Sequence, residues 1–226
     1  MRTLSRVQRG LETLYRIDTG LAVDDFMIDE PTRDGLGTTR RPREQLLVCE
    51  EDGEMGLALF IHPTVLANLA THDPGRRLGD HNLGDFLLAV EGVSHFIYAI
   101  CCARAERPVT QLELELQAEV DKYVTCLLVT SPTARSGERG HWHGVGPGTA
   151  QSETLRHRLF DADYEPDLDH EERDRYRAAN DNAQRYAAWL ESTYVAPRRI
   201  PEMLDELRRF YREGLAGKLS RIARAA

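Results

Sequence analysis

One apolar segment of the sequence carries two side chains whose types and spacing could do chemistry. Residues 86–103 read FLLAVEGVSHFIYAICCA, and Glu91 and His95 stand four residues apart within them. In a helix this spacing places both side chains on one face. Apolar residues surround the rest of the axis, so the helix should be buried on all sides. A buried carboxylate and a buried imidazole each need a partner, and we expect this pair to be hydrogen-bonded in the core.

The helix that follows offers further partners for the buried pair. Thr110 and Glu113 have the spacing of a capping box, which predicts a helix over residues 110–129. The connection between the two helices is short, so they should pack as an antiparallel pair. In that arrangement Glu119 and Tyr123 lie level with the buried pair, and we predict a polar cluster of four side chains.

A metal site is the alternative interpretation of this cluster. Glu91, His95 and Glu119 would supply two carboxylates and an imidazole, a ligand set that suits iron, manganese or zinc. However, the Glu-x-x-x-His spacing is not the Glu-x-x-His of carboxylate-bridged di-iron bundles, and a second matching pair is absent from the sequence. We therefore interpret the cluster as a structural hydrogen-bond network that holds no metal and no other cofactor, and keep the metal site as the alternative.

A second group of candidates lies in a segment of different composition. Glycine, serine, proline and threonine dominate residues 131–152, which predicts a mobile loop. His141 and His143 could give a metal two ligands, but the spacing supplies no third. Trp142 loses apolar burial unless it docks, so we predict that it contacts the body of the protein or a partner. The glycines here lack the Gly-Lys-Ser/Thr ending of a phosphate-binding loop.

The C-terminal end of the chain is basic. Arg208 and Arg212 are candidates for contact with an acidic partner or RNA. The alternative is that these cations suit the C-terminus of a helix and balance the acidic segment at 161–174. We favour this alternative, because no aromatic side chains are interleaved with the arginines in the manner of a nucleic-acid-stacking surface.

The bulk composition narrows the function classes. The 226 residues carry a net charge of −8, which argues against duplex nucleic acid or an anionic membrane as the main partner. The four cysteines form no Cys-x-x-Cys pair, so we expect core thiols and a reducing, cytoplasmic compartment. Residues 86–103 approach membrane-spanning length, but their polar side chains favour a buried core helix, and no membrane span is predicted.

The remaining patterns predict an α+β fold that is predominantly helical. An amphipathic helix is expected over residues 3–18. Strands are expected over about 23–28, 46–50 and 55–61, the last two joined by a hairpin turn at Asp52-Gly53. These strands would form a small antiparallel sheet, covered by the N-terminal helix and the central antiparallel helix pair.

The last third of the chain is predicted to add two further helices. They cover residues 170–193, capped by Asp169 with Glu172, and a stripe from Leu204 to Ile222. The predicted organisation is therefore an α+β core over 1–130, the mobile loop over 131–152 and a helical extension over 153–226.

Two function classes remain after these exclusions. The sequence carries no nucleotide-binding loop, no nucleophile motif and no strong metal-ligand spacing. We therefore expect a cytosolic, non-enzymatic interaction or adaptor protein, with a protein partner or self-association as its binding event. The alternative is a helical enzyme that depends on a metal or cofactor held by the Glu/His cluster, and the sequence is compatible with both classes.

Overall fold

A computed structural model describes residues 3–37, 41–51, 53–130, 148–160 and 169–225. The described chain is α+β and predominantly helical, as predicted. It forms two compact units, residues 1–108 and 109–226. The boundary falls between the two central helices, so their predicted antiparallel packing stays a prediction, and so does the predicted division at residues 130 and 152.

The first unit, unit 1, contains all of the described strands. Its elements in chain order are helix α1 (Thr3–Tyr15), the 3-10 turn η1 (Val23–Phe26), strand β1 (Met27–Ile28), helix α2 (Glu30–Gly35), strands β2 (Glu44–Glu51) and β3 (Glu54–Ile61), and helices α3 (Pro63–Thr71) and α4 (Leu83–Arg104).

The sheet of unit 1 is mixed rather than fully antiparallel. Its strand order is β1-β3-β2. β2 and β3 form the predicted hairpin, with Glu44 opposite Ile61, and Gly53 in the turn takes a φ of +78°. β1 pairs in parallel with β3, because β2 carries the chain back across the sheet before β3 begins. The predicted strand over 23–28 is reduced to its last two residues, since the four before them form η1.

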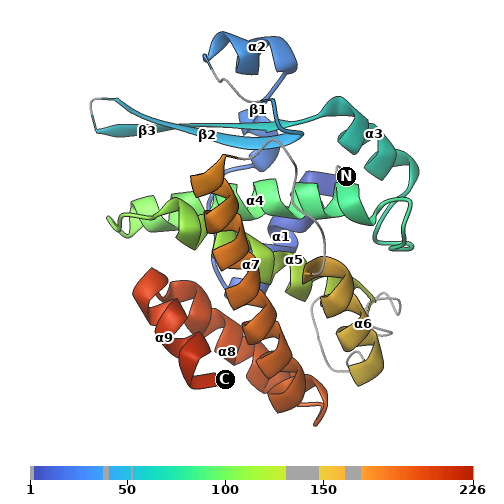
Figure 1. Cartoon of the computed structure of the whole chain (residues 1–226). Coiled ribbons are helices and arrows are strands. Elements are labelled where there is room, and N and C mark those ends of the chain that lie inside the picture. The colour runs from blue at the N-terminus through green and yellow to red at the C-terminus, as the bar shows by residue number, and fades with distance from the viewer. Residues whose placement is uncertain (1–2, 38–40, 52, 131–147, 161–168, 226) are drawn as a thin grey trace. The chain divides into compact units, whose positions relative to one another are not determined.

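Helix α4 is the core element of unit 1. It packs against β2, β3, α1 and α3, and in Figure 1 it lies on one side of the sheet while α2 lies on the other. By length and composition α4 could cross a membrane, but 72% of its apolar window is buried inside the fold. Because the core helix of a globular protein meets the same criteria, this is weak evidence for a span.

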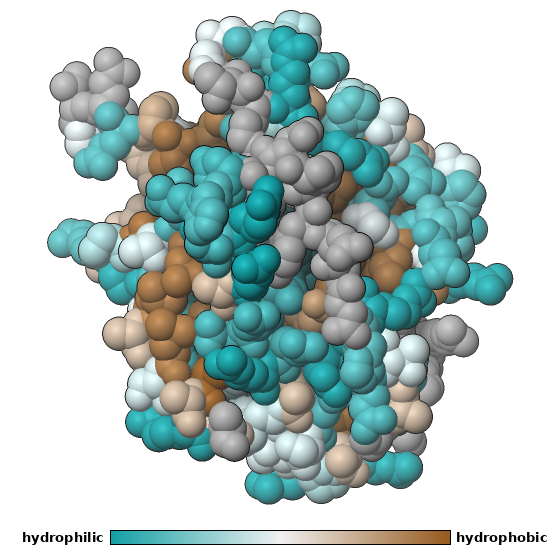
Figure 2. All heavy atoms as spheres, viewed as in Figure 1, coloured by the Kyte–Doolittle hydropathy of each residue, from teal (hydrophilic) through white to brown (hydrophobic). Residues whose placement is uncertain are grey.

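The outer part of the hairpin exposes apolar side chains. Val48 on β2 and Met55 on β3 are 54% and 38% exposed. Figure 2 shows this apolar surface over the hairpin, beside the hydrophilic surface of α2. The exposed Glu50 lies on the edge strand β2, and a charged side chain at an edge discourages another strand from adding to it.

The second unit, unit 2, is helical throughout its described residues. Its elements are α5 (Gln111–Thr130), α6 (Thr149–Phe160), α7 (His170–Leu190), the π-helical turn η3 (Glu191–Val195), α8 (Ile200–Arg212) and α9 (Leu215–Ala225). α7 packs along α5, and α6 and α9 both contact α7. Both predicted caps are present: the Glu113 amide donates to Thr110 Oγ1 at 3.2 Å, and Asp169 forms a capping box with Glu172.

Two predictions for this part of the chain need correction. α6 begins at Thr149, so the last residues of the predicted loop are helical; its residues 131–147 lie outside the described chain. The predicted last helix is two helices, because Glu213 adopts extended backbone angles and ends α8. Apolar periodicity continues across this break, which is why the sequence pattern reads as one helix.

Candidate functional site

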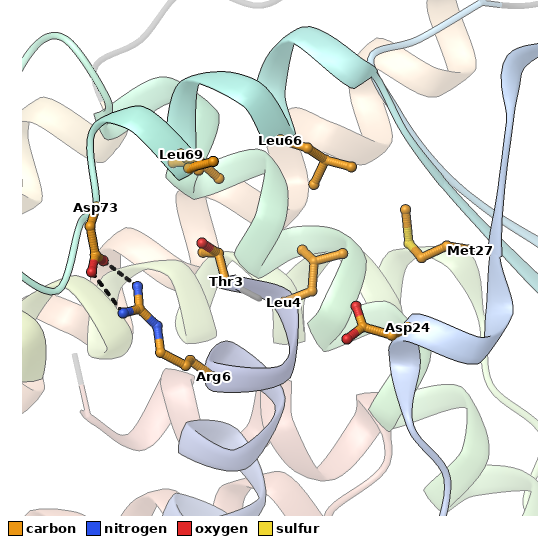
Figure 3. A pocket seen from close by; sticks show the side chains of 9 residues that line it. Thr3, Leu4, Arg6, Asp24, Met27, Leu66, Leu69 and Asp73 are labelled. Carbon is orange, nitrogen blue, oxygen red and sulfur yellow. Dashed lines mark hydrogen bonds and ion pairs between the residues drawn. The ribbon is translucent and has the colours of Figure 1, made fainter. Parts of the chain in front are cut away.

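A cleft of about 460 Å³ opens in unit 1 between α1 and α3. Its walls are mostly apolar, and Figure 3 shows side chains from both helices, from η1 and from β1 directed toward it. The lining residues are Thr3, Leu4, Arg6, Asp24, Met27, Leu66, Leu69, Ala70 and Asp73. None of them belonged to the predicted site.

The apolar wall has a buried floor and a partly exposed mouth. Leu4 on α1 and Leu69 on α3 are 2% and 1% exposed. Met27 and Leu66 are half-buried, so an incoming group would cover surface that water now reaches. The sequence places Leu4 on the apolar stripe of α1, but it gives no indication that α3 lies opposite.

An ion pair closes one end of the cleft. Arg6 Nη1 donates to Asp73 Oδ2 at 2.8 Å, and Nη2 donates to Oδ1 of the same carboxylate. This bidentate hydrogen bonding holds the pKa of Asp73 below its usual value, and it raises the pKa of Arg6. The Gly75 amide also donates to Asp73, at 2.9 Å. The two charges of this ion pair balance each other.

The opposite end of the cleft carries the carboxylate of Asp24. Ser5 Oγ donates to Asp24 Oδ2 at 2.6 Å. Within the described parts of the chain, no lysine, arginine or histidine forms an ion pair with Asp24. In Figure 3 the Asp24 side chain lies beside Met27, at the end of the cleft away from Arg6 and Asp73. The cleft therefore combines an apolar wall with one negative charge at its end.

The predicted polar cluster divides between the two units. Glu91 and His95 lie on α4 in unit 1, whereas Glu119 and Tyr123 lie on α5 in unit 2. His95 is 7% exposed and Glu91 is half-buried. The predicted contact of Glu119 and Tyr123 with the α4 pair stays a prediction.

Unit 1 brings a further carboxylate close to His95, a contact that sequence reasoning missed. Glu44 of β2 places its Oε1 3.9 Å from His95 Nδ1. A Cβ at Gly92 would lie 2.9 Å from the same oxygen, so the glycine makes room for this carboxylate over the helix. The sequence gives no signal for this approach, because it depends on how the sheet lies across α4.

In unit 2 the Tyr123 hydroxyl belongs to a buried network. It donates to Glu191 Oε1 at 3.1 Å and lies 3.1 Å from Ser152 Oγ. Ser152 donates to the same carboxylate oxygen at 2.6 Å, and Arg156 Nε donates to Glu191 Oε2 at 2.8 Å. Burial raises the pKa of the Tyr123 phenol well above its usual value. Glu119, by contrast, pairs with Lys122 at 2.6 Å.

The predicted partner contacts have local partners or fall outside the described chain. Arg208 Nη1 lies 2.7 Å from Asp205 Oδ1, and Arg212 Nη1 donates to the Arg208 carbonyl oxygen at 2.7 Å. These local contacts favour the alternative interpretation, in which the cations stabilise the helix that carries them. Trp142 lies outside the described residues, and so do His141 and His143.

The chain matches no protein-family model, no curated protein and no solved structure.

Proposed function

We propose that this protein is a non-enzymatic interaction protein of the cytosol, and that its unit 1 binds a short segment of a partner protein in the cleft between α1 and α3. The segment would place an aliphatic side chain against Leu4, Leu66 and Leu69. A lysine or arginine next to it would pair with Asp24. The observation that carries the proposal is the apolar cleft with an acidic end whose carboxylate has only Ser5 as a described partner.

The size and chemistry of the cleft support binding. Its volume of about 460 Å³ falls within the range of roughly 300–1,000 Å³ that is common for ligand sites. Such sites are mostly apolar, with a few polar groups that fix the orientation of the ligand. Here Asp24 is the orienting group, because the Arg6–Asp73 pair is already satisfied.

The two parts of the proposed contact differ in strength. Covering an aliphatic side chain contributes about 1.5–3 kcal/mol, whereas an exposed ion pair contributes about 0–1 kcal/mol. We therefore expect the apolar contact to supply most of the affinity and Asp24 to supply specificity. Both terms are small, so the complex should be weak and reversible, as suits an adaptor.

A cytosolic location is supported by the cysteines. All four are thiols, and Cys49 is exposed on the hairpin. An exposed thiol persists most readily in a reducing compartment.

The experiment is a selection of displayed heptapeptides on the full-length protein, followed by affinity measurement with the enriched peptides. We expect the enriched sequences to share an aliphatic residue next to lysine or arginine. Leu66→Glu should abolish their binding, because it puts a charge into the apolar wall. Asp24→Lys should weaken the binding of basic peptides. The same variant should bind peptides in which glutamate replaces the basic residue.

The matched control is Val48→Glu, which introduces the same charge at an exposed apolar residue on the hairpin. It should leave peptide binding unchanged. Enriched peptides that bind Leu66→Glu as tightly as the unaltered protein would contradict the proposal. Loss of binding in Val48→Glu alone would move the interaction surface to the hairpin.

A further inference from the structure

We propose that unit 2 binds a small planar aromatic carboxylic acid in an open hollow beside Trp189. The hollow has a volume of about 320 Å³, at the lower end of the range that is common for ligand sites. It is lined by residues of α7, η3 and the end of α9, which are Arg185, Ala188, Trp189, Ser192 and Ala225. None of them lines the cleft of unit 1, so this site is separate from the proposed peptide site.

The first argument is the spacing of the lining residues along the chain. Arg185 and Trp189 stand four residues apart on α7, so their side chains share one helix face. Ser192 follows on η3 and lines the same hollow. α9 packs against α7, and Ala225 near its end adds only a methyl group to the wall. A cation, an aromatic ring and a hydroxyl therefore border one hollow.

The second argument is the fixed orientation of the Trp189 ring. It stacks on the buried ring of Tyr186, with the ring centroids 5.7 Å apart. The ring of Tyr194 lies nearly perpendicular to the Trp189 ring, at 5.4 Å between centroids. Trp189 is nevertheless half-buried, so part of its surface meets water in the hollow. An indole that is already held in place can contact a second aromatic ring at a low cost in conformational entropy.

The third argument is the charge of Arg185. Its side chain is exposed, and within the residues that the structure describes it forms no ion pair. Arg177, eight residues earlier on the same helix, pairs with Asp174 at 3.9 Å. A guanidinium can bind a carboxylate through two parallel hydrogen bonds. Arg185 can make this contact with a ligand without giving up an ion pair within the described fold.

The short distance between the two groups selects the class of ligand. On a helix, side chains four residues apart have Cβ atoms about 5–6 Å apart, so the acidic group of the ligand must lie close to its aromatic ring. An aromatic carboxylic acid meets this requirement, because its carboxylate is attached to the ring or one carbon away. A nucleotide does not meet it as well, because a ribose separates the base from the phosphate.

The irregular helix beside the hollow agrees with a binding role. In η3 the Ala196 amide donates to the Glu191 carbonyl oxygen at 2.8 Å, five residues earlier. Single π-helical turns of this kind are frequent at functional sites. η3 carries both Ser192, which lines the hollow, and Tyr194, which contacts Trp189, so the turn shapes the hollow directly.

The experiment measures the binding of indole-3-acetate to the full-length protein by calorimetry, with ligand-detected NMR as a second readout. We expect saturable binding of one ligand per chain. Indole-3-acetamide keeps the ring but lacks the charge, and it should bind at least about tenfold more weakly. Cyclohexaneacetate keeps the charge but lacks the aromatic ring, and it should also bind more weakly.

The variants test the two groups separately. Arg185→Gln removes the cation and Ser192→Glu places a carboxylate at the rim, and each should weaken binding at least about tenfold. Both residues are exposed, so both variants should fold. Arg177→Gln is the matched control, because it removes another exposed arginine of α7, and it should leave the affinity unchanged. Trp189→Leu should also weaken binding; circular dichroism shows whether it is folded, and the other two variants decide the question if it is not.

Three outcomes would overturn the inference. The first is the absence of saturable binding of indole-3-acetate. The second is an Arg185→Gln variant that binds this ligand as tightly as the unaltered protein does. The third is tighter binding of adenosine monophosphate than of indole-3-acetate, which would assign the hollow to a phosphate ligand. The Leu66→Glu variant of the cleft should bind indole-3-acetate normally, so the two proposals can fail independently.

Discussion

Two carboxylates, one in each unit, accept a hydrogen bond of the same length from a serine and differ in their other surroundings. Ser5 donates to Asp24 at 2.6 Å in unit 1, and Ser152 donates to Glu191 at 2.6 Å in unit 2. Asp24 is half-exposed at the end of a cleft, whereas Glu191 is 5% exposed. Glu191 also accepts hydrogen bonds from Tyr123 and from the guanidinium of Arg156.

We interpret this difference as one between a proposed binding role for Asp24 and a structural role for Glu191. A buried carboxylate is tolerated when donors and a cation compensate for its lost hydration, and Glu191 has both. Asp24 keeps part of its hydration, so the fold does not need a cation beside it. Under the proposed function, a basic group of the ligand would pair with this carboxylate. We therefore expect Glu191 to matter for stability and Asp24 to matter for recognition.

The largest expected effect is that of Glu191→Ala. The substitution would leave Arg156 without its carboxylate and would remove the oxygen that accepts hydrogen bonds from both the Tyr123 and the Ser152 hydroxyls. Removing one member of a buried ion pair typically costs about 3–5 kcal/mol, and we expect the free energy of unfolding to fall by about 3 kcal/mol. Urea denaturation measures this. Glu153→Ala, an exposed position on α6, is the control; equal losses in both variants would contradict the structural role of Glu191.

A smaller effect is expected for Tyr123→Phe, which removes only the hydroxyl. One buried hydrogen bond contributes about 0.5–1.5 kcal/mol, or more when its partner is charged. Burial raises the pKa of Tyr123, so its neutral form contributes stability that is present below the unfolded pKa of about 10 and falls as the pH rises above it. The variant should lose less stability than the unaltered protein between pH 9 and 11. Parallel pH curves would count against this reading.

The Arg6–Asp73 pair at the closed end of the cleft should contribute less. Both side chains are about one-third exposed, at 34% and 29%, so Asp73→Ala should cost about 0.5–1 kcal/mol at pH 7. The folded-state pKa of Asp73 is lowered, so this contribution exists above its unfolded pKa and is lost as the pH falls through the lower folded value. The unaltered protein and Asp73→Ala should therefore differ less in their free energy of unfolding, measured by urea denaturation, at pH 2.5 than at pH 7. A difference that stays constant would show that the lost contacts are not ionic.

The smallest effect on stability is expected for Asp24→Asn. The amide oxygen can still accept the hydrogen bond from Ser5, so the free energy of unfolding should change by no more than about 0.5 kcal/mol. The same substitution should weaken the binding of basic peptides. A large loss of stability here would remove the contrast with Glu191 and assign Asp24 to the structure of unit 1.

Local patterns account for what the sequence by itself determined. The capping contacts of Thr110 and Asp169 depend on residues three apart, and the hairpin turn at Gly53 depends on one backbone conformation. The burial of His95 follows from the apolar residues around it on one helix. In each case the residues that determine the local structure lie close together in the sequence.

The tertiary structure alone decided the relations between distant segments. Three contacts join residues far apart in the sequence. β1 pairs in parallel with β3, Glu44 approaches His95, and α1 and α3 line the same cleft. Asp24 and Asp73 look like ordinary surface acids in the sequence, and they differ in the structure because Arg6 donates to Asp73 whereas Ser5 donates to Asp24. Such contacts depend on how sheet and helices pack around α4, and no periodicity within a single element encodes that packing.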